Sequence, residues 1–305
     1  MIIAIIVILI LLFITWDIYH YVFHRNKGCL IRLFMDKKNH SEEYYAKRDS
    51  NAEKLRQAVQ EKYEIHSDRG EFLRGFYLPC GEEKSKTVAF VVHGYRSEHA
   101  ETAGMFLDYY HSRGIDVFTC DHTGHGESEG KHIGYDRFES DDCLKWLDFL
   151  VDKFGEDISI VLHGFSMGGA TVMKMSDRLP PQVKFVCEDS GFISGEEILR
   201  GQLGPLFGLM DFINGFVAGY RMSDTDVRAN ISNAKAPFLV VHGFDDPTVP
   251  FSMAPEIYKL IPTEKDQLLL PGIKHIETMH FAADDYMEKL DEFLVKTGCA
   301  VKING

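Results

Sequence analysis

The chain has 305 residues, 45% of them hydrophobic and 26% charged, which is the composition of an ordinary globular protein and excludes a disordered one. The formal net charge is −13, and a nucleic-acid-binding domain needs a basic face, so we exclude nucleic acid as a partner. The six cysteines are spread singly without a CxxC pair, so we expect reduced thiols.

The first 16 residues carry no charge and are almost wholly Ile, Leu, Val and Phe. At about 1.5 Å per residue they cover roughly 24 Å, and the aromatic and apolar residues that follow extend the run toward the ~30 Å of a bilayer core. We predict an uncleaved membrane anchor over residues 1–24; a signal peptide, which would need a basic leading region, and a buried core helix are the alternatives. By the positive-inside rule, the cations after the run place the rest of the chain in the cytoplasm. These cations are Arg25, Lys27, Arg32, Lys37 and Lys38.

Residues 25–62 are predicted to form a charged connector next to the membrane, with a surface helix in its second half. From about residue 36 this segment is rich in charged helix formers and has little apolar periodicity. After it, Glu64–His66 and Phe72–Leu78 predict an antiparallel hairpin that turns at residues 67–70.

Apolar runs and helical stretches then alternate along the chain. Runs such as Thr87–His93 are typical of strands that are buried on both faces of a sheet. This alternation predicts an α/β fold, in which helices cover both faces of a mostly parallel sheet. We expect strands at 87–93, 115–120, 158–163, 183–187, 238–242 and 267–270, and helices at 100–113, 137–154, 169–178, 252–260 and 284–296.

Residues 193–236 interrupt this rhythm with leucines, phenylalanines and methionines separated by glycines. The segment predicts either two helices packed on the core or a small helical cap over the sheet. Its position between two strands favours a cap, inserted between core segments 63–192 and 237–305.

The pentapeptide Gly164-Phe165-Ser166-Met167-Gly168 lies between an apolar strand and a helix, which is the context of a G-x-S-x-G nucleophile turn. Its glycines leave room for a tight turn that presents the Ser166 hydroxyl at the carboxyl edge of the sheet. A serine hydroxyl needs a base, and His275, in the loop after the last strand, has the right setting. His280 is the nearest competitor, but it lies on or next to a helix.

An acid must orient the imidazole, and both Asp245 and Asp246 follow the strand at 238–242. The position of these residues leaves the choice between the two open. Either one gives the chain order Ser, Asp, His, which is the order of the G-x-S-x-G hydrolases.

With these motifs in place, residues from Tyr63 to Lys296 resemble the α/β-hydrolase superfamily. More narrowly, they are similar to its serine aminopeptidase/lysophospholipase-like (S33-type) branch, which includes bacterial membrane-anchored hydrolases. The family pattern H-G-x-x-D-x-x-V-P matches His242–Pro250 and selects Asp246, and G-x-x-H matches Gly272–His275. The element D-x-x-G-H-G-x-S matches Asp121–Ser128, which we expect to be structural.

The resemblance implies an oxyanion hole built from two backbone amides. One is that of Met167, directly after the nucleophile, and the other is that of Tyr95, in a family H-G-x element that begins at His93 and Gly94. We expect the cap to line an apolar substrate pocket together with His93 and Gly94. The predicted pocket consists of His93, Gly94, Leu206, Phe207, Met210 and Phe212.

The function expected from these residues is hydrolysis of a carboxylic ester, with a lipophilic acyl ester such as a lysophospholipid or monoacylglycerol as the substrate. The alternatives are an aminopeptidase or amidase, with Glu188, Asp189, Glu196 or Glu197 holding the substrate amine, and a non-catalytic membrane-tethered binding protein. No HExxH, GxGxxG or P-loop is present in the required context, so we expect no metal and no cofactor.

Overall fold

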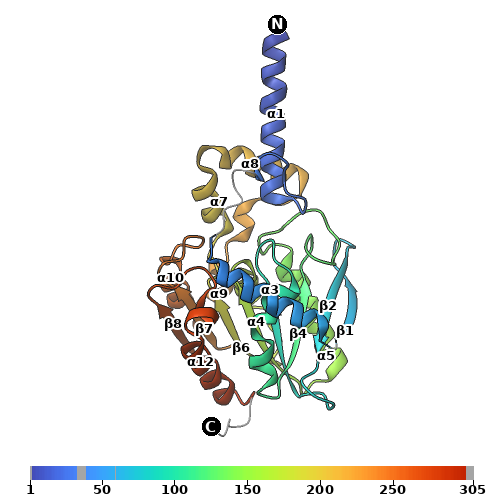
Figure 1. Ribbon diagram of the computed structural model, residues 1–305, viewed down its shortest axis with the longest axis vertical. Helices are drawn as coiled ribbons and strands as arrows, with labels where there is room; N and C mark the ends of the chain where they lie inside the picture. The colour runs from blue at the N-terminus through green and yellow to red at the C-terminus, as the bar shows by residue number, and fades with distance from the viewer. Residues whose placement is uncertain (1, 33–38, 59, 300–305) are drawn as a thin grey trace.

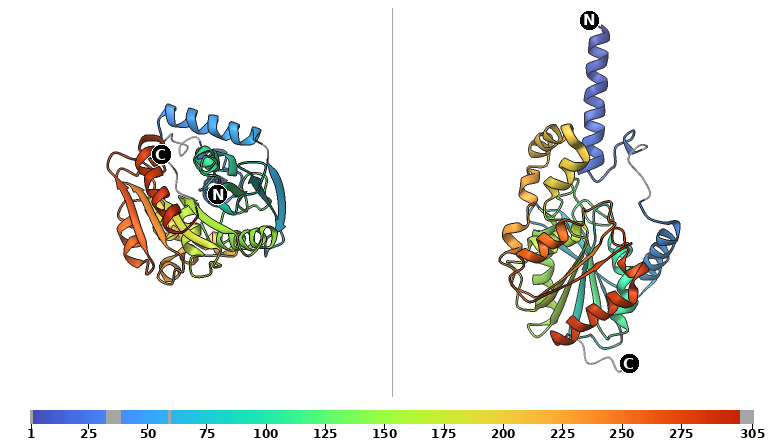
Figure 2. Two further views of the ribbon diagram at one scale, coloured as in Figure 1. Left: turned by 90° about the horizontal axis from the view of Figure 1, so that it is seen from below. Right: turned by 90° about the vertical axis from the view of Figure 1, so that its left-hand side faces the viewer.

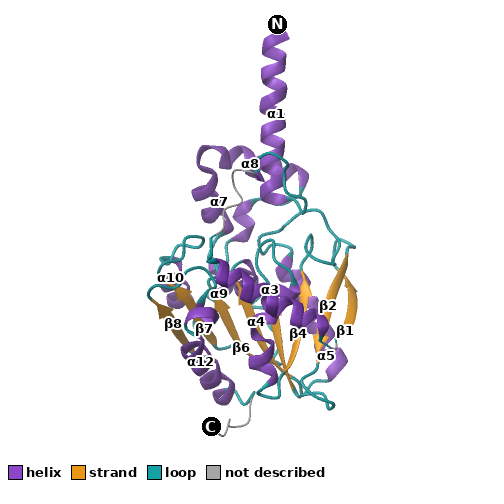
Figure 3. Cartoon of the chain, viewed as in Figure 1, coloured by secondary structure: helices purple, strands orange, loops and turns teal. Residues whose placement is uncertain are grey.

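The structure is a computed structural model that describes residues 2–32, 39–58 and 60–299. Its centre is an eight-stranded sheet in the order β1-β2-β4-β3-β5-β6-β7-β8 (Figure 3). Strands β1, β2 and β4 pair antiparallel, and every further neighbouring pair is parallel. The strands are β1 (Glu61–His66), β2 (Phe72–Leu78), β3 (Thr87–Val92), β4 (Asp116–Asp121), β5 (Ser159–Phe165), β6 (Val183–Asp189), β7 (Phe238–Gly243) and β8 (Lys265–Leu270).

Helices cover both faces of this sheet, which is why all six residues of β3 are buried (Figures 1 and 2). One apolar cluster joins the sheet to α5 (Glu139–Phe154), α6 (Met167–Lys174) and α10 (Met253–Leu260). The other cluster joins it to α3 (Glu42–Gln57), α4 (His99–His111) and α12 (Ala283–Lys296). The chain therefore has the α/β-hydrolase architecture that the sequence predicts.

Helix α1 (Ile2–Phe23) projects away from this domain (Figure 1). By its length and composition it can cross a membrane, and only 11% of its most apolar window is buried, so it is not a core helix. Its C-terminal end is nevertheless attached to the domain. Tyr19 and Phe23 are fully buried, and the Asp17 carboxylate accepts hydrogen bonds from the backbone amides of residues 29–31.

Helix α3 shows that the second half of the predicted connector belongs to the folded domain. Ser41 caps the helix by accepting a hydrogen bond from the Tyr44 amide, and the buried Leu55 packs into the cluster of α4 and α12. The fit against α4 is close, because a Cβ placed on Gly104 would lie 2.7 Å from the carbonyl oxygen of Asn51. Lys37 and Lys38 lie outside the described residues.

The segment between β6 and β7 forms a helical cap at the end of the domain that carries α1 (Figure 1). Helix α8 contacts α1. The cap consists of α7 (Gly195–Leu203), the 3₁₀ turns η1 (Gly204–Leu206) and η2 (Met222–Thr225), α8 (Phe207–Val217) and α9 (Arg228–Ile231). A further short helix, α11 (Thr278–Phe281), precedes α12 and carries His280.

We expect Gly104→Ala to lower the free energy of unfolding by about 1–3 kcal/mol, because the added methyl group meets the backbone of α3. The matched control is Gly201→Ala in α7, where no atom lies within 4 Å of the new Cβ. The control should be neutral or more stable by up to ~1 kcal/mol, as is usual for this exchange in a helix. Urea unfolding of the full chain measures both variants. Equal stability of the two variants would contradict the close packing of α3 on α4.

Candidate active site

The turn between β5 and α6 holds Ser166 in an unusual backbone conformation, with φ 54° and ψ −116°. Residues with a side chain rarely adopt a positive φ, so the surrounding residues must hold Ser166 in this conformation. A Cβ on Gly164 would lie 2.3 Å from the Gly168 carbonyl oxygen, and one on Gly168 would lie 2.2 Å from that of Val92. A side chain at either position would clash with the neighbouring backbone, so the turn requires both glycines.

Three side chains from separate loops meet at this turn. The Nε2 atom of His275 lies 2.8 Å from the Ser166 hydroxyl oxygen, and its Nδ1 atom lies 2.6 Å from Oδ2 of Asp246. The other Asp246 oxygen accepts hydrogen bonds from the amides of Thr248 and Val249, at 2.7 and 2.9 Å. Burial raises the pKa of Asp246, but the hydrogen bonds from His275 and the two amides outweigh it and leave this pKa below its usual value. Asp246 is therefore ionised at neutral pH.

The two competitors named from the sequence lie apart from this chain of hydrogen bonds. Asp245 is exposed, whereas Asp246 is buried next to the imidazole. His280 faces Glu43 of α3, with 3.8 Å between Nε2 and the carboxylate oxygen.

The loop after β3 approaches the serine from the opposite side. A Cβ on Gly94 would lie 3.2 Å from the Cβ of Ser166, so the Gly94 backbone passes directly over the nucleophile turn. Tyr95 follows in this loop, and Met167 opens α6 on the other side of Ser166. The two amides predicted to form the oxyanion hole thus belong to the two backbone segments that flank the serine.

Buried histidines hold the loop after β3 in place. His93 accepts a hydrogen bond from the His122 amide, and the His122 ring in turn contacts the His93 carbonyl oxygen. His125 accepts the amide hydrogen of Arg96, which has a positive φ of 57°. Burial and the neighbouring His93 lower the pKa of His125 to about 3, so this ring stays a neutral acceptor. The glycine-rich element that contains His122 and His125 is therefore structural.

Side chains of the same loop hold the end of α1. The Tyr95 hydroxyl donates to the carbonyl oxygens of Tyr21 and Val22, at 3.1 and 2.9 Å. The Arg96 guanidinium donates to the carbonyl oxygens of Tyr21 and His24. These carbonyls are the ones that a helix C-terminus leaves without partners, and its dipole favours a cation there. The sequence predicts the Tyr95 amide in the oxyanion hole, its ring beside the pocket and Arg96 as a solvated charge, whereas the binding of both side chains to α1 is a tertiary contact.

A cavity of about 270 Å³ opens at Ser166 and His275. One wall is formed by residues on both sides of the nucleophile, including Gly94, Tyr95 and Phe165. The other wall comes from the segment predicted to be a connector, with Asn39, His40, Tyr44, Tyr45 and Arg48.

The predicted pocket was wrong in its cap residues. Phe207 and Met210 are buried in the apolar cluster beneath the cap, whereas Leu206 and Phe212 are exposed. Phe212 lines a separate surface hollow with Phe216, and His93 lies fully buried behind Gly94. The error arose because apolar composition does not determine which way a helix faces.

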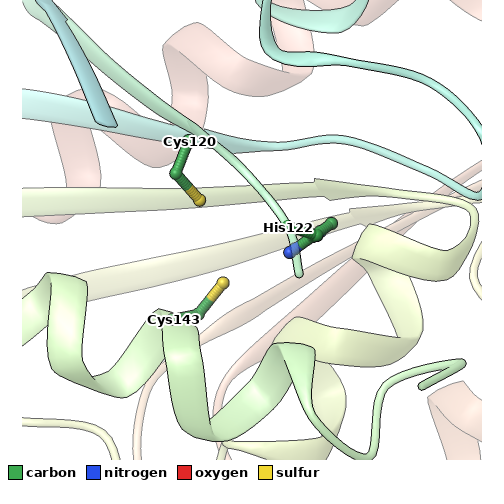
Figure 4. Close-up of side chains that lie close together, drawn as sticks. All are labelled: Cys120, His122 and Cys143. Carbon is green, nitrogen blue, oxygen red and sulfur yellow. The ribbon is translucent and has the colours of Figure 1, made fainter. Parts of the chain in front are cut away.

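Cys120, His122 and Cys143 form the group of potential metal ligands in the described part of the chain, with ligand atoms within 4.8 Å of one another (Figure 4). His122 Nδ1 has no hydrogen-bond partner among the described residues. Burial raises the pKa of the Cys143 thiol well above its usual value, so this thiol is protonated at neutral pH. Cys120 and Cys143 lie in the apolar core, where free cysteine packs as a small hydrophobic residue.

The acidic residues considered for an amine site are placed elsewhere. Glu188 and Asp189 are fully buried behind the nucleophile turn, and the Asp189 carbonyl oxygen accepts the Ser166 amide hydrogen. Glu196 and Glu197 pair with Arg200 and Arg228 on the cap surface.

Comparison with known proteins agrees with this geometry. Residues 83–193 match the family described as "Serine aminopeptidase, S33". The uncharacterized protein YqkD of Bacillus subtilis is 28% identical over 199 residues, which are 62% of this chain and 64% of YqkD. This part of the chain therefore resembles the S33-type α/β-hydrolases.

Two further similarities agree with the α/β-hydrolase fold. The α/β hydrolase domain-containing protein aho-3 of Caenorhabditis elegans is 26% identical over 188 residues, 61% of this chain and 51% of aho-3. The match therefore spans about half to two thirds of these two relatives. The esterase Pf2001 of Pyrococcus furiosus has the same fold, with a TM-score of 0.65, 21% identity and coverage of 80% of this chain and 94% of Pf2001. At 21% identity the likeness to Pf2001 shows the fold, and these similarities determine neither the activity nor the substrate.

The buried carboxyl of Asp189 gives the fold a pH dependence. Burial raises its pKa to about 6, although Ser190 donates to the carboxylate at 2.8 Å. A raised pKa means that the folded chain holds this proton more tightly, so the stabilisation is complete below pH ~4 and is lost as pH rises through about 6. Between pH 4.5 and 7.5 we expect this group to lower the wild-type free energy of unfolding by about 2 kcal/mol. The Asp189→Asn variant should not show this decrease. Urea unfolding at both pH values measures this, with the exposed Asp245→Asn as the control. The same pH dependence in wild type and Asp189→Asn would contradict the assignment.

Proposed function

We propose that the protein is a serine hydrolase that cleaves carboxylic esters through an acyl-enzyme, with Ser166 as nucleophile, His275 as base and Asp246 as the orienting acid. The observation that carries the proposal is the continuous chain of hydrogen bonds from the Ser166 hydroxyl through both imidazole nitrogens to the buried carboxylate. The esterase function stated for Pf2001, which shares the fold, supports esters over other acyl substrates.

The reaction follows from the geometry in two steps. Ser166 attacks the ester carbonyl while His275 Nε2 takes the hydroxyl proton, and Asp246 stabilises the imidazolium that forms. The amides of Met167 and Tyr95 donate to the oxyanion, and the imidazolium then protonates the departing alcohol. Water, deprotonated by the same imidazole, releases the acid and restores Ser166.

We further propose that α1 is an uncleaved membrane anchor and that the substrate is a lipophilic ester. The support for an uncleaved helix is its bonding to the catalytic domain, because Tyr95 and Arg96 bind its last carbonyls and Phe23 is buried. The basic residues after α1 favour a cytoplasmic domain. Tyr95, Tyr45 and Met105 contribute apolar surface to the cavity beside Ser166.

We expect Ser166→Ala to lower kcat for p-nitrophenyl esters by about 10⁴-fold or more, because the nucleophile is lost. The assay uses the full chain in detergent micelles, since α1 contacts the loop over the serine, and an acyl series from acetyl to palmitoyl. The control is Ser252→Ala, an exposed serine at the start of α10. A fluorophosphonate probe should label wild type but not Ser166→Ala. Turnover of aminoacyl-naphthylamides instead of esters, or no labelling of folded wild type, would contradict the proposal.

We expect Arg96→Ala to lower kcat for a p-nitrophenyl ester about tenfold and to change KM less, because the loop that carries the Tyr95 amide loses its hold on α1. Rescue by deletion of α1 is not expected, since Tyr95 would then lose its partners as well. Arg200→Ala is the control, because this exposed arginine on α7 pairs only with cap residues. An unchanged kcat in Arg96→Ala would show that the contact with α1 does not position the Tyr95 amide for catalysis.

A further inference from the structure

Helix α8 of the cap carries apolar residues on its outer face as well as on its inner face. Phe207 and Met210 are buried, and polar residues face inward beside them: Asp211 accepts hydrogen bonds from the Arg221 side chain and the Met222 amide, and Asn214 is fully buried. Three further large apolar residues face outward, with Leu209 47%, Phe212 64% and Phe216 88% exposed. These residues recur at helical spacing and form one continuous stripe, which we name the α8 stripe.

Helix α8, which carries the α8 stripe, lies beside the base of α1 (Figure 1). The link is direct, because the Tyr19 hydroxyl donates to the Asn214 side chain of α8 at 3.5 Å. Trp16, one helical turn before Tyr19, is half exposed, and the residues before it are the apolar part of α1. Helix α8 therefore packs against the base of α1, next to the apolar part that α1 would present to lipid.

The charges near the base of α1 also fit a membrane surface. Arg25, Lys27 and Lys131 are exposed there, and the Arg25 amide donates to the Lys131 carbonyl oxygen at 2.7 Å. Basic residues next to a membrane helix bind the anionic headgroups of the cytoplasmic leaflet. Exposed apolar residues on one helix, together with cations near the base of α1, are the features of a surface that binds the membrane interface.

We propose that α8 lies in the interface of the bilayer that α1 crosses, with Leu209, Phe212 and Phe216 in contact with acyl chains. The occupant of the α8 stripe is thus lipid, and the exposed apolar residues reflect a hydrocarbon environment on the outer face of α8. This inference rests on the proposed membrane anchor and extends the proposed function, because it specifies how the enzyme meets its substrate.

The consequence for catalysis comes from the shared wall of the cavity. Tyr95 and Arg96 line the cavity at Ser166 and also bind the last carbonyls of α1. With α1 and α8 both in the membrane, this cavity lies next to the lipid headgroups. The substrate class is then an ester that enters from the bilayer, with its acyl chain drawn from the leaflet that holds the cap.

The immersion of α8 is tested without any turnover. A nitroxide is attached at Phe216→Cys in the full chain, with Cys29 and Cys80 replaced by serine and the protein in phosphatidylcholine vesicles. We expect oxygen to relax this label at least threefold more effectively than a water-soluble nickel chelate. The matched control is Val295→Cys, an apolar residue of α12 that is 48% exposed. Helix α12 lies at the end of the domain away from α1 (Figure 1), so the chelate should dominate at this site. Equal exposure to the chelate at both sites, or dipolar broadening from a second copy of the chain, would overturn the proposal.

The functional arm compares two presentations of the substrate. Phe212→Glu with Phe216→Glu should lower hydrolysis of a fatty ester held in vesicles about tenfold and leave p-nitrophenyl acetate hydrolysis unchanged. Val295→Glu should change neither rate. Equal rates of wild type and the double variant on the vesicle-borne ester would overturn the role of the α8 stripe. A failure of the proposed ester hydrolysis is separate from both results, because it shows as the absence of p-nitrophenyl acetate turnover in wild type.

Discussion

The backbone conformation of Ser166 is the constraint on which the site depends. A residue with φ 54° is held there only because its neighbours leave no alternative. The Gly168 backbone is pressed against Val92 of β3, and the Ser166 amide donates to the Asp189 carbonyl oxygen of β6 at 2.8 Å. The two strands on either side of β5 therefore fix the backbone of the turn. This fixed backbone sets the direction of the Ser166 hydroxyl.

The second feature that organises the molecule is the loop after β3. On its inner side neutral histidines bind its backbone, and on its outer side Tyr95 and Arg96 bind the end of α1. Burial keeps the His125 ring uncharged, so this support does not change near neutral pH. The projecting helix and the nucleophile turn are thus connected through one short loop. The chain is better described as one folded unit with a protruding helix than as a domain on a flexible tether.

The strand and helix positions were predicted well because they depend on local patterns. Apolar runs such as Thr87–His93 predict strands buried on both faces, and the structure has β3 at Thr87–Val92. The contacts between segments that are far apart in the sequence could not be predicted in the same way. The charged residues of α3 suggested a solvated connector, yet Tyr44 and Arg48 form one wall of the cavity. The cap composition suggested a pocket lining, yet its apolar stripe faces away from Ser166. No local pattern reports which face of a helix meets the protein.

By itself the sequence determined the alternation of strands and helices, and it identified Ser166, Asp246 and His275 through the motifs around them. These features are local, because backbone conformation and loop position follow from neighbouring residues. Only the tertiary structure decided that the imidazole bridges the serine and the buried carboxylate, at 2.8 and 2.6 Å. It also decided that residues 39–48 complete the cavity and that the Arg96 guanidinium binds the backbone at the end of α1. Such contacts join segments far apart in the chain, and they depend on packing that no single segment encodes.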